Sequence, residues 1–261
     1  MSDPGRLVVL DDADAVARAA AEQVVTRANT AVSEYGTFSI ALSGGSTPKR
    51  LYSLLADPSS PYRSRIVWER VRVFFGDERH VPPDDPQSNY RMARETLLDR
   101  VPIPAENVHR ILAERPAEEA ASLYEEDLRA AFSLGPGGVP RFDLVLLGMG
   151  EDGHTASLFP GTAALAERQR LAVANWVPRF SAFRITLTLP VLNSARADVF
   201  LVAGRDKAGL LAAVFGPSSA QDAYPCQLVR PAAGELIWLV DRLAAARVPR
   251  EYDDSAARSV T

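Results

Sequence analysis

The sequence predicts an α/β protein whose mainly parallel, doubly wound sheet is covered by helices on both faces. Short apolar runs typical of buried strands alternate with longer segments of helical periodicity. Parallel neighbouring strands need crossover connections, and the helices in those connections cover both faces of the sheet. The chain has 261 residues, of which 47% are apolar, so its core is large enough to need no disulfide or metal. We expect residues 1–261 to form one domain with a frayed tail over 250–261.

The predicted strands are short apolar runs bounded by polar or turn-forming residues. They span residues 7–10, 38–42, 71–75, 142–147, 171–175, 184–188, 199–203 and 236–240. Ligands of parallel sheets bind beyond the carboxyl ends of the strands. We therefore expect the functional site in the loops that follow Leu42, Phe75, Leu147 and Ala203.

The predicted helices lie between these strands. They cover residues 11–34, 88–100, 116–134, 207–215 and 241–246, and one more begins near residue 47. Thr47 followed by Pro48 predicts a helix start, because the hydroxyl can cap the helix and proline suits its first turn. Ser88 is expected to cap the next helix in the same way.

Charge and composition exclude several classes of protein. The net charge is −4 and no run of basic residues occurs, so no nucleic-acid partner is expected. Cys226 is the only cysteine, which excludes an intramolecular disulfide and a cysteine-rich zinc site. No stretch approaches 18 apolar residues and the N-terminus lacks the pattern of a secretion signal, so neither a membrane span nor secretion is expected. We expect a soluble cytoplasmic protein.

The loop after the second predicted strand has the composition of a phosphate site. It combines two glycines with three hydroxyl side chains: Ser43, Gly44, Gly45, Ser46 and Thr47. The glycines let the backbone approach a ligand, and the N–H groups of the following helix start favour an anion. The pattern differs from a Walker A loop. The alternative interpretation is an ordinary strand–turn–helix connection.

The loop after the third predicted strand places charged side chains at the end of an apolar run. Arg79 could bind a phosphate or carboxylate through two N–H groups. Asp77 could act as a base or accept a hydrogen bond from a sugar hydroxyl. The alternative is a solvated loop in which these two residues form a local ion pair.

The loop after residues 142–147 contains Asp152-Gly153-His154 within a formal Gly-x-Gly-x-x-Gly pattern. Dinucleotide binding is not expected, because Pro160-Gly161 interrupts the next helix and no acid occurs over residues 170–176. An imidazole at a strand end can act as a general base near neutral pH, which makes His154 the candidate catalytic residue. The alternative is a histidine that only packs the glycine-rich turn. No histidine spacing indicates a metal site.

Two further cations follow later strands. Arg184 stands at the start of a predicted strand, and Lys207 opens a predicted helix. Only two of the 29 basic residues are lysines, the other being Lys49. The helix dipole disfavours a cation at the position of Lys207, so we interpret this residue as an anion ligand. The alternative is a solvated lysine.

Six segments together resemble the 6-phosphogluconolactonase family, in the family's order and over about residues 7–240. They are SGGSTP at 43–48, GDER-x-VP at 76–82, SN at 88–89, GMGEDGHTASLFPG at 148–161, Arg184 with Thr186 and Thr188, and GRDK at 204–207. The resemblance implies hydrolysis of 6-phosphogluconolactone to 6-phosphogluconate in the pentose phosphate pathway, without a metal or organic cofactor. It also implies a fold similar to glucosamine-6-phosphate deaminase and ribose-5-phosphate isomerase.

Two other functions stay open at this point. Glucosamine-6-phosphate deaminases share the Gly-x-Gly-x-Asp-Gly-His segment but continue with Ile-Ala-Phe-Asn-Glu-Pro. Here residues 155–160 are Thr-Ala-Ser-Leu-Phe-Pro and contain no acid, which favours the lactonase. A non-catalytic sugar-phosphate sensor would need an attached helix-turn-helix, which we do not expect before Leu7 or in the tail.

The hypothesis for the reaction assigns a role to each candidate. His154 removes a proton from the water that attacks the C1 carbonyl, and returns it to the ring oxygen. Asp152 orients or polarises the site, and Asp77 contacts sugar hydroxyls or helps to place the water. The phosphate is bound by the 43–47 loop, Arg79, Arg184 and Lys207. The expected partner is a small sugar-phosphate lactone, and the expected state is a monomer or a weak homo-oligomer.

Overall fold

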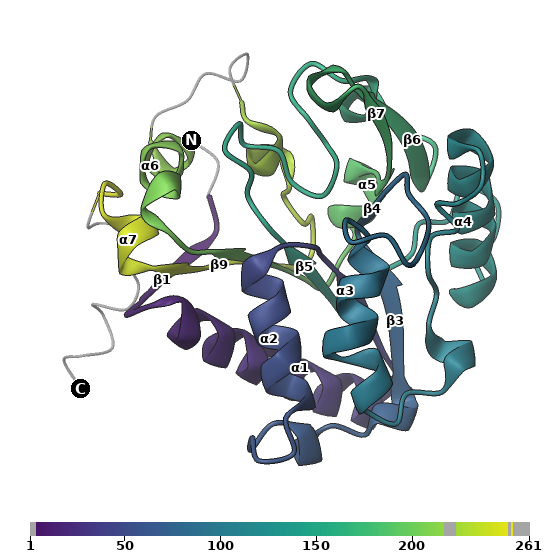
Figure 1. Ribbon diagram of the computed structural model, residues 1–261, viewed down its shortest axis with the longest axis horizontal. Coiled ribbons are helices and arrows are strands. Elements are labelled where there is room, and N and C mark those ends of the chain that lie inside the picture. The colour runs from purple at the N-terminus through teal and green to yellow at the C-terminus, as the bar shows by residue number, and fades with distance from the viewer. Residues whose placement is uncertain (1–3, 217–222, 250–251, 253–261) are drawn as a thin grey trace.

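The structure is a computed structural model that describes residues 4–216, 223–249 and 252 (Figure 1). Its centre is a six-stranded sheet in which all neighbouring strands run parallel. The strand order is β1 (Arg6–Leu10), β9 (Glu235–Asp241), β8 (Ala197–Val202), β5 (Leu144–Leu147), β2 (Phe38–Leu42) and β3 (Val71–Phe75). The mainly parallel sheet predicted from the sequence is confirmed. Most of the tail predicted to fray lies outside the described residues.

Helices cover both faces of this sheet (Figure 1). The helices around it are α1 (Ala13–Tyr35), α2 (Ser46–Ala56), α6 (Ala208–Phe215) and α7 (Arg242–Ala245). α1 and α2 lie on one face, and α6 packs with α7 on the other. α1 buries a stripe of small side chains at helical spacing, which lets its backbone approach the strands: Val16, Ala17, Ala20, Ala21, Val24, Val25, Ala28 and Ala31. The predicted doubly wound arrangement follows from this packing.

A second sheet, which the sequence analysis did not predict, lies beside the carboxyl ends of the parallel strands. It is antiparallel, in the order β4 (Asp77–Arg79), β7 (Ala182–Leu187) and β6 (Ala172–Val177). The helix α4 (Ala117–Ala131) packs against β6 and β7. The segment predicted as a loop after β3 is therefore partly a strand, because β7 pairs with it over more than a hundred residues of sequence. Local composition carries no signal for such a long-range partner.

Two predicted helix starts had different outcomes. Ser88 caps α3 (Asn89–Thr96) as predicted, and its hydroxyl accepts a hydrogen bond from the Arg91 N–H at 3.1 Å. The cap assigned to Thr47 was wrong, because α2 already begins at Ser46. Gly45 occupies the cap position with φ of 111°, and no side chain caps this helix. The first N–H groups of α2 are therefore not covered by a capping side chain. The short helix α5 (Leu189–Leu192) connects β7 to β8.

The direction of the connections changes between β2 and β5, which are neighbours in the sheet. After β2 the next strand of this sheet is β3 on one side, whereas after β5 the next strands of this sheet are β8 and then β9 on the other side. Loops that leave two adjacent parallel strands in opposite directions open a crevice between them. The loops that follow Leu42 and Leu147 border this crevice.

Asp198 in β8 is a carboxylic acid buried in the core. Its side chain is fully buried, and neither carboxyl oxygen has a hydrogen-bond partner among the described residues. Burial raises the pKa of Asp198 well above its ordinary range. The folded protein therefore keeps the proton at a pH where the unfolded chain has lost it.

This difference predicts a pH-dependent cost of folding at Asp198. Stability falls as the pH rises from the ordinary Asp value of about 4 toward the raised folded pKa, because unfolding then releases a proton. The Asp198→Asn variant removes that term. Its melting temperature should exceed that of the wild type by more near pH 8 than near pH 4. Asp99→Asn, at an exposed acid, is the control and should show no such trend. A gain for Asp198→Asn that does not change with pH would contradict the account.

Candidate active site

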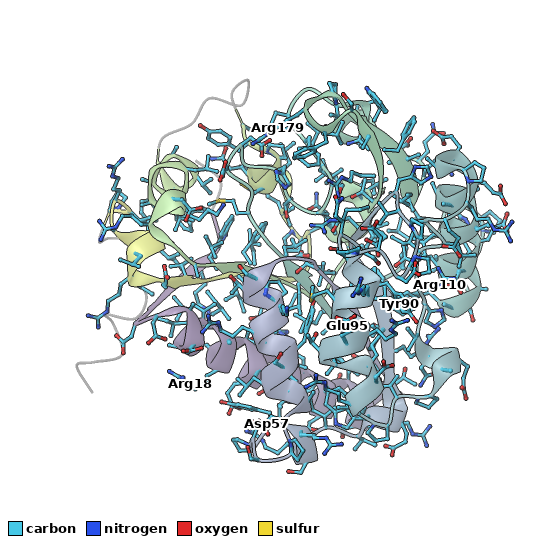
Figure 2. The ribbon with its side chains drawn as sticks, in the orientation of Figure 1. Arg18, Asp57, Tyr90, Glu95, Arg110 and Arg179 are labelled. Atoms are coloured by element: carbon cyan, nitrogen blue, oxygen red, sulfur yellow. The ribbon has the colours of Figure 1, made fainter. Side chains whose placement is uncertain are left out.

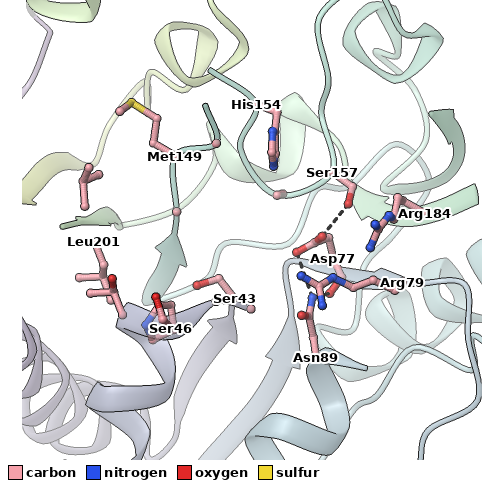
Figure 3. A pocket seen from close by; sticks show the side chains of 18 of the residues that line it. Ser43, Ser46, Asp77, Arg79, Asn89, Met149, His154, Ser157, Arg184 and Leu201 are labelled. Carbon is pink, nitrogen blue, oxygen red and sulfur yellow. Dashed lines mark hydrogen bonds between the residues drawn. The ribbon is translucent and has the colours of Figure 1, made fainter. Parts of the chain in front are cut away.

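A cavity of about 370 Å³ opens at the crevice between β2 and β5 (Figure 3). Loops after β2, β5 and β8 line it together with the second sheet. The lining includes ten of the eleven residues predicted from the sequence: Ser43, Gly44, Gly45, Ser46, Thr47, Asp77, Arg79, His154, Arg184 and Lys207. Asp152 does not line the cavity and lies behind His154. The structure thus brings together residues that are up to 164 positions apart in the chain.

The loop after β2 is held from below by a buried tyrosine. The Tyr52 hydroxyl accepts a hydrogen bond from the Ser43 N–H at 3.0 Å and donates one to the Ser43 carbonyl at 2.9 Å. Ser43 is buried, yet its own hydroxyl has no hydrogen-bond partner among the described residues. Gly44 packs against Asn89 so closely that a Cβ would lie 1.9 Å from the side-chain oxygen. Only glycine fits there, and the free Ser43 hydroxyl is left for a ligand.

Two arginines stand directly opposite each other on neighbouring strands of the second sheet. Arg79 in β4 pairs in register with Arg184 in β7, and both line the cavity (Figure 3). Burial and the repulsion from Arg79 lower the pKa of Arg184, and its buried Nε has no hydrogen-bond partner among the described residues. Like charges directly opposite in a sheet are unfavourable. An anion bound between them would remove the repulsion and supply the missing acceptor.

The carboxylate of Glu78 holds this part of the site in place, and the sequence analysis did not identify it. The side chain is buried and accepts hydrogen bonds from the N–H groups of Arg79, Asn89 and Tyr90 and from the Ser88 hydroxyl, at 2.7 to 3.0 Å. Burial raises the pKa of Glu78 against the effect of these bonds. The three bonds from Ser88, Asn89 and Tyr90 fix β4 to the start of α3.

Asp77 is also buried, with its carboxylate already engaged. Its Oδ2 accepts a hydrogen bond from the Ser157 hydroxyl at 2.6 Å, and its carbonyl accepts one from the Asn89 side chain at 2.9 Å. Ser157 and Asn89 line the cavity as well. Neither was predicted to be a site residue, because their roles depend on contacts between distant segments. The alternative of an Asp77–Arg79 ion pair in a solvated loop is wrong. Asp77 is 7% exposed and its carboxylate bonds to Ser157, whereas the Arg79 guanidinium donates to the Gln87 carbonyl.

His154 and Asp152 form a hydrogen-bonded pair. The His154 Nδ1 lies 2.5 Å from the Asp152 Oδ1, which also accepts the His154 backbone N–H at 3.2 Å. Burial acts to raise the pKa of Asp152, but the hydrogen bonds and charge of His154 outweigh it and the pKa is lowered. A carboxylate at Nδ1 places the ring proton there and leaves Nε2 with a free lone pair. His154 lines the cavity, so this lone pair is available to a bound water or substrate.

Two neighbours fix the plane of the His154 ring. The ring stacks on Phe159 with 4.0 Å between centroids. The backbone of Gly150 also approaches the ring closely, so that a Cβ there would lie 2.0 Å from Nδ1. Phe159 and Gly150 together therefore restrict the position of the ring.

Lys207 enters the cavity from the loop after β8. Gly204 in that loop donates its N–H to the Asp241 carboxylate at 3.1 Å, which holds the loop against β9. The Lys207 Nζ lies 3.2 Å from Asp206, an exposed carboxylate, so the lysine is not simply solvated. Among the residues that the structure describes, no cluster of three or more His, Cys, Asp and Glu side chains could hold a metal ion. None of the described helices is long and apolar enough to cross a membrane.

Comparison with known proteins identifies the family of this chain. The family described as glucosamine-6-phosphate isomerases/6-phosphogluconolactonase matches residues 11–238. The chain belongs to this family. A curated 6-phosphogluconolactonase from a Nostoc strain is 47% identical over 92% of this chain and 97% of its own length. The resemblance inferred from the motifs is confirmed.

Solved structures of relatives extend this result to the fold. The 6-phosphogluconolactonase of Trypanosoma brucei is 30% identical, with a TM-score of 0.81 over 94% of this chain and 99% of its own. A monomeric glucosamine-6-phosphate deaminase aligns with a TM-score of 0.75 over 93% of this chain and 99% of its own, at 17% identity. At that identity the deaminase supports the shared fold alone, and the predicted similarity to the deaminase fold is confirmed.

The packing around His154 predicts that Gly150→Ala inactivates the site without unfolding the protein. The new Cβ would displace the imidazole from Asp152, so kcat should lose much of the about 10²- to 10⁴-fold that a general base contributes. The affinity for the product should remain, because the cations of the cavity are not touched. Gly135→Ala is the control, since a Cβ there meets no atom within 4 Å. Unchanged kcat in Gly150→Ala would contradict the packing argument.

Proposed function

We propose that this family member hydrolyses 6-phospho-D-glucono-1,5-lactone to 6-phospho-D-gluconate, in the oxidative pentose phosphate pathway. The observation that carries the proposal is the pairing of two features in one cavity: a cluster of cations and a histidine–aspartate pair. The names of the relatives support the same substrate. The reaction needs a site that binds the phosphate at one end of the substrate and an activated water at the other end.

The cations and the loop after β2 form the phosphate grip. Arg79 and Arg184 repel each other across the cavity, and the Ser43 hydroxyl and the Arg184 Nε have no hydrogen-bond partner among the described residues. A phosphate satisfies all of these groups, and Lys207 and the first N–H groups of α2 add to the positive field. Binding energy from this remote end holds the lactone carbonyl in position for attack.

His154 supplies the base. Its Nε2 removes a proton from water as the oxygen attacks C1, and the proton then moves to the ring oxygen as the C1–O bond breaks. Asp152 stabilises the imidazolium that forms in between. A lactone is an activated ester, so no covalent intermediate with the protein is required. Asp77, already bonded to Ser157, is assigned to sugar hydroxyls or to the position of the water.

The deaminase alternative is less well supported by the cavity. Asp77 is the one carboxylate among the described residues that line it. The residues that follow His154 in the sequence contain no acid up to Pro160. We also propose that the enzyme works in the cytoplasm as a monomer or weak homo-oligomer.

The first expected result is the activity itself. Purified protein should accelerate the loss of freshly generated 6-phosphogluconolactone above its spontaneous rate, and should do so in the presence of a chelator. A coupled assay that forms the lactone in place measures this directly. Release of ammonia from glucosamine 6-phosphate, without lactonase activity, would move the assignment to the deaminase.

The second expected result concerns the phosphate grip. Arg79→Ala and Lys207→Ala should each lower kcat/KM for the phosphorylated lactone by about 10- to 150-fold, the effect of losing a charge-assisted contact. The unphosphorylated lactone should be a poor substrate whose hydrolysis hardly changes in these variants. Lys49→Ala is the matched control, because Lys49 does not line the cavity. Equal losses of kcat/KM on both lactones would show that these residues do not recognise the phosphate group.

A further inference from the structure

The hairpin between β6 and β7 reaches the histidine–aspartate pair from outside the cavity loops. Its tip is the turn Pro178–Phe180 followed by Ser181, and Arg179 projects from it at the upper edge of the molecule (Figure 2). Neither the motifs nor the reaction described above uses this arginine. Its contacts nevertheless run directly to the acid behind the proposed base.

The two oxygens of the Asp152 carboxylate have different partners. Oδ1 lies 2.5 Å from the His154 Nδ1, and Oδ2 lies 3.3 Å from the Arg179 Nη1. The Arg179 Nη2 is also 3.8 Å from Glu151. Arg179 therefore donates a hydrogen bond to the carboxylate oxygen that His154 does not contact. This bond resists rotation of the carboxylate away from the imidazole.

The neighbouring residue in the hairpin tip supports the same pair through ring contacts. Phe180 meets Phe159 edge-on at 5.7 Å, and Phe159 stacks on His154. The guanidinium of Arg184 also lies over the Phe180 ring, 5.2 Å from its centroid. The hairpin tip thus touches two neighbours of the proposed base, Asp152 and Phe159, and one of the proposed phosphate ligands.

We propose that Arg179 is a positioning residue, which orients the Asp152 carboxylate and offsets part of its charge as seen by His154. The proposal rests on the proposed function, in which His154 is the general base. It adds a residue that touches neither substrate nor the reacting atoms and acts through Asp152 alone. Other titratable groups around the pair are Glu151, which also contacts Arg179, and Tyr224 and Cys226 of the segment packed on Gly153. Asp77 and Arg184 line the same cavity as His154.

The sign of the effect follows from the charges. Asp152 favours the protonated imidazole, and the cation of Arg179 opposes that preference. Removing Arg179 should therefore raise the pH at which His154 gains its proton. Exposed ion pairs contribute little to folding, and the Arg179 side chain is 55% exposed, so a change in melting temperature is not expected. A shift in titration without a loss of stability separates positioning from a structural role.

The test compares Arg179→Met and Arg179→Lys with the wild type. The acid limb of kcat should move to higher pH in Arg179→Met, with kcat at its plateau lower by about 2- to 5-fold, the range of an exposed ion pair. Arg179→Lys should restore both values toward the wild type. Arg65→Met is the matched control, because it removes an exposed arginine that pairs with Glu22 far from the cavity.

A second readout does not depend on lactonase activity. The chain has only three histidines, so the ring proton of His154 can be assigned in NMR spectra by its absence in His154→Gln and titrated directly. The titration midpoint should rise in Arg179→Met and not in Arg65→Met. An unchanged or lower midpoint in Arg179→Met would overturn the proposed effect of the Arg179 charge, and an unchanged plateau kcat would overturn its positioning of Asp152, even if the wild type is fully active. Absence of lactonase activity in the wild type would instead overturn the proposed function. The titration would then still show whether Arg179 acts on the pair of Asp152 and His154.

Discussion

The site depends on one constraint of topology: the chain leaves the neighbouring strands β2 and β5 in opposite directions. Because both strands are parallel and adjacent, their carboxyl ends are close, while the loops beyond them must diverge. The glycine–serine loop and the loop that carries His154 border the resulting crevice. Glycines at Gly44 and Gly150 then let Asn89 and the imidazole approach the backbone more closely than any side chain would allow.

The second sheet turns this crevice into a site with two chemically different ends. β4 continues from β3 and pairs with β7, which sets Arg79 against Arg184 at the cost of repulsion between them. The Glu78 carboxylate stabilises that geometry through three hydrogen bonds from the start of α3 and one from the Arg79 N–H. The remaining end holds His154, whose orientation depends on Asp152, Phe159 and, through the hairpin tip, Arg179. Binding and proton transfer are therefore assigned to separate groups that the same hairpin connects.

The sequence predicted those parts of the molecule that depend on local pattern. Apolar runs located the parallel strands, and the strand ends located the loops, because the period of the pattern reports which side chains are buried. It did not predict the antiparallel sheet, since the pairing of β4 with β7 joins distant segments. It also missed Glu78, Ser157 and Arg179, whose roles exist only through contacts made in the folded chain. The cap assigned to Thr47 failed because Gly45 adopts a positive φ and takes the cap position, so α2 begins two residues earlier than predicted.

The central claim is that His154 is the general base of a site whose phosphate grip works without it. The most direct test measures kcat and the affinity for 6-phosphogluconate in His154→Gln beside Asp77→Asn. The account predicts that His154→Gln loses about 10²- to 10⁴-fold in kcat, binds the product as the wild type does and no longer shows the acid limb. A folded His154→Gln protein with near-wild-type kcat, together with an inactive Asp77→Asn, would contradict it and transfer the role of base to Asp77.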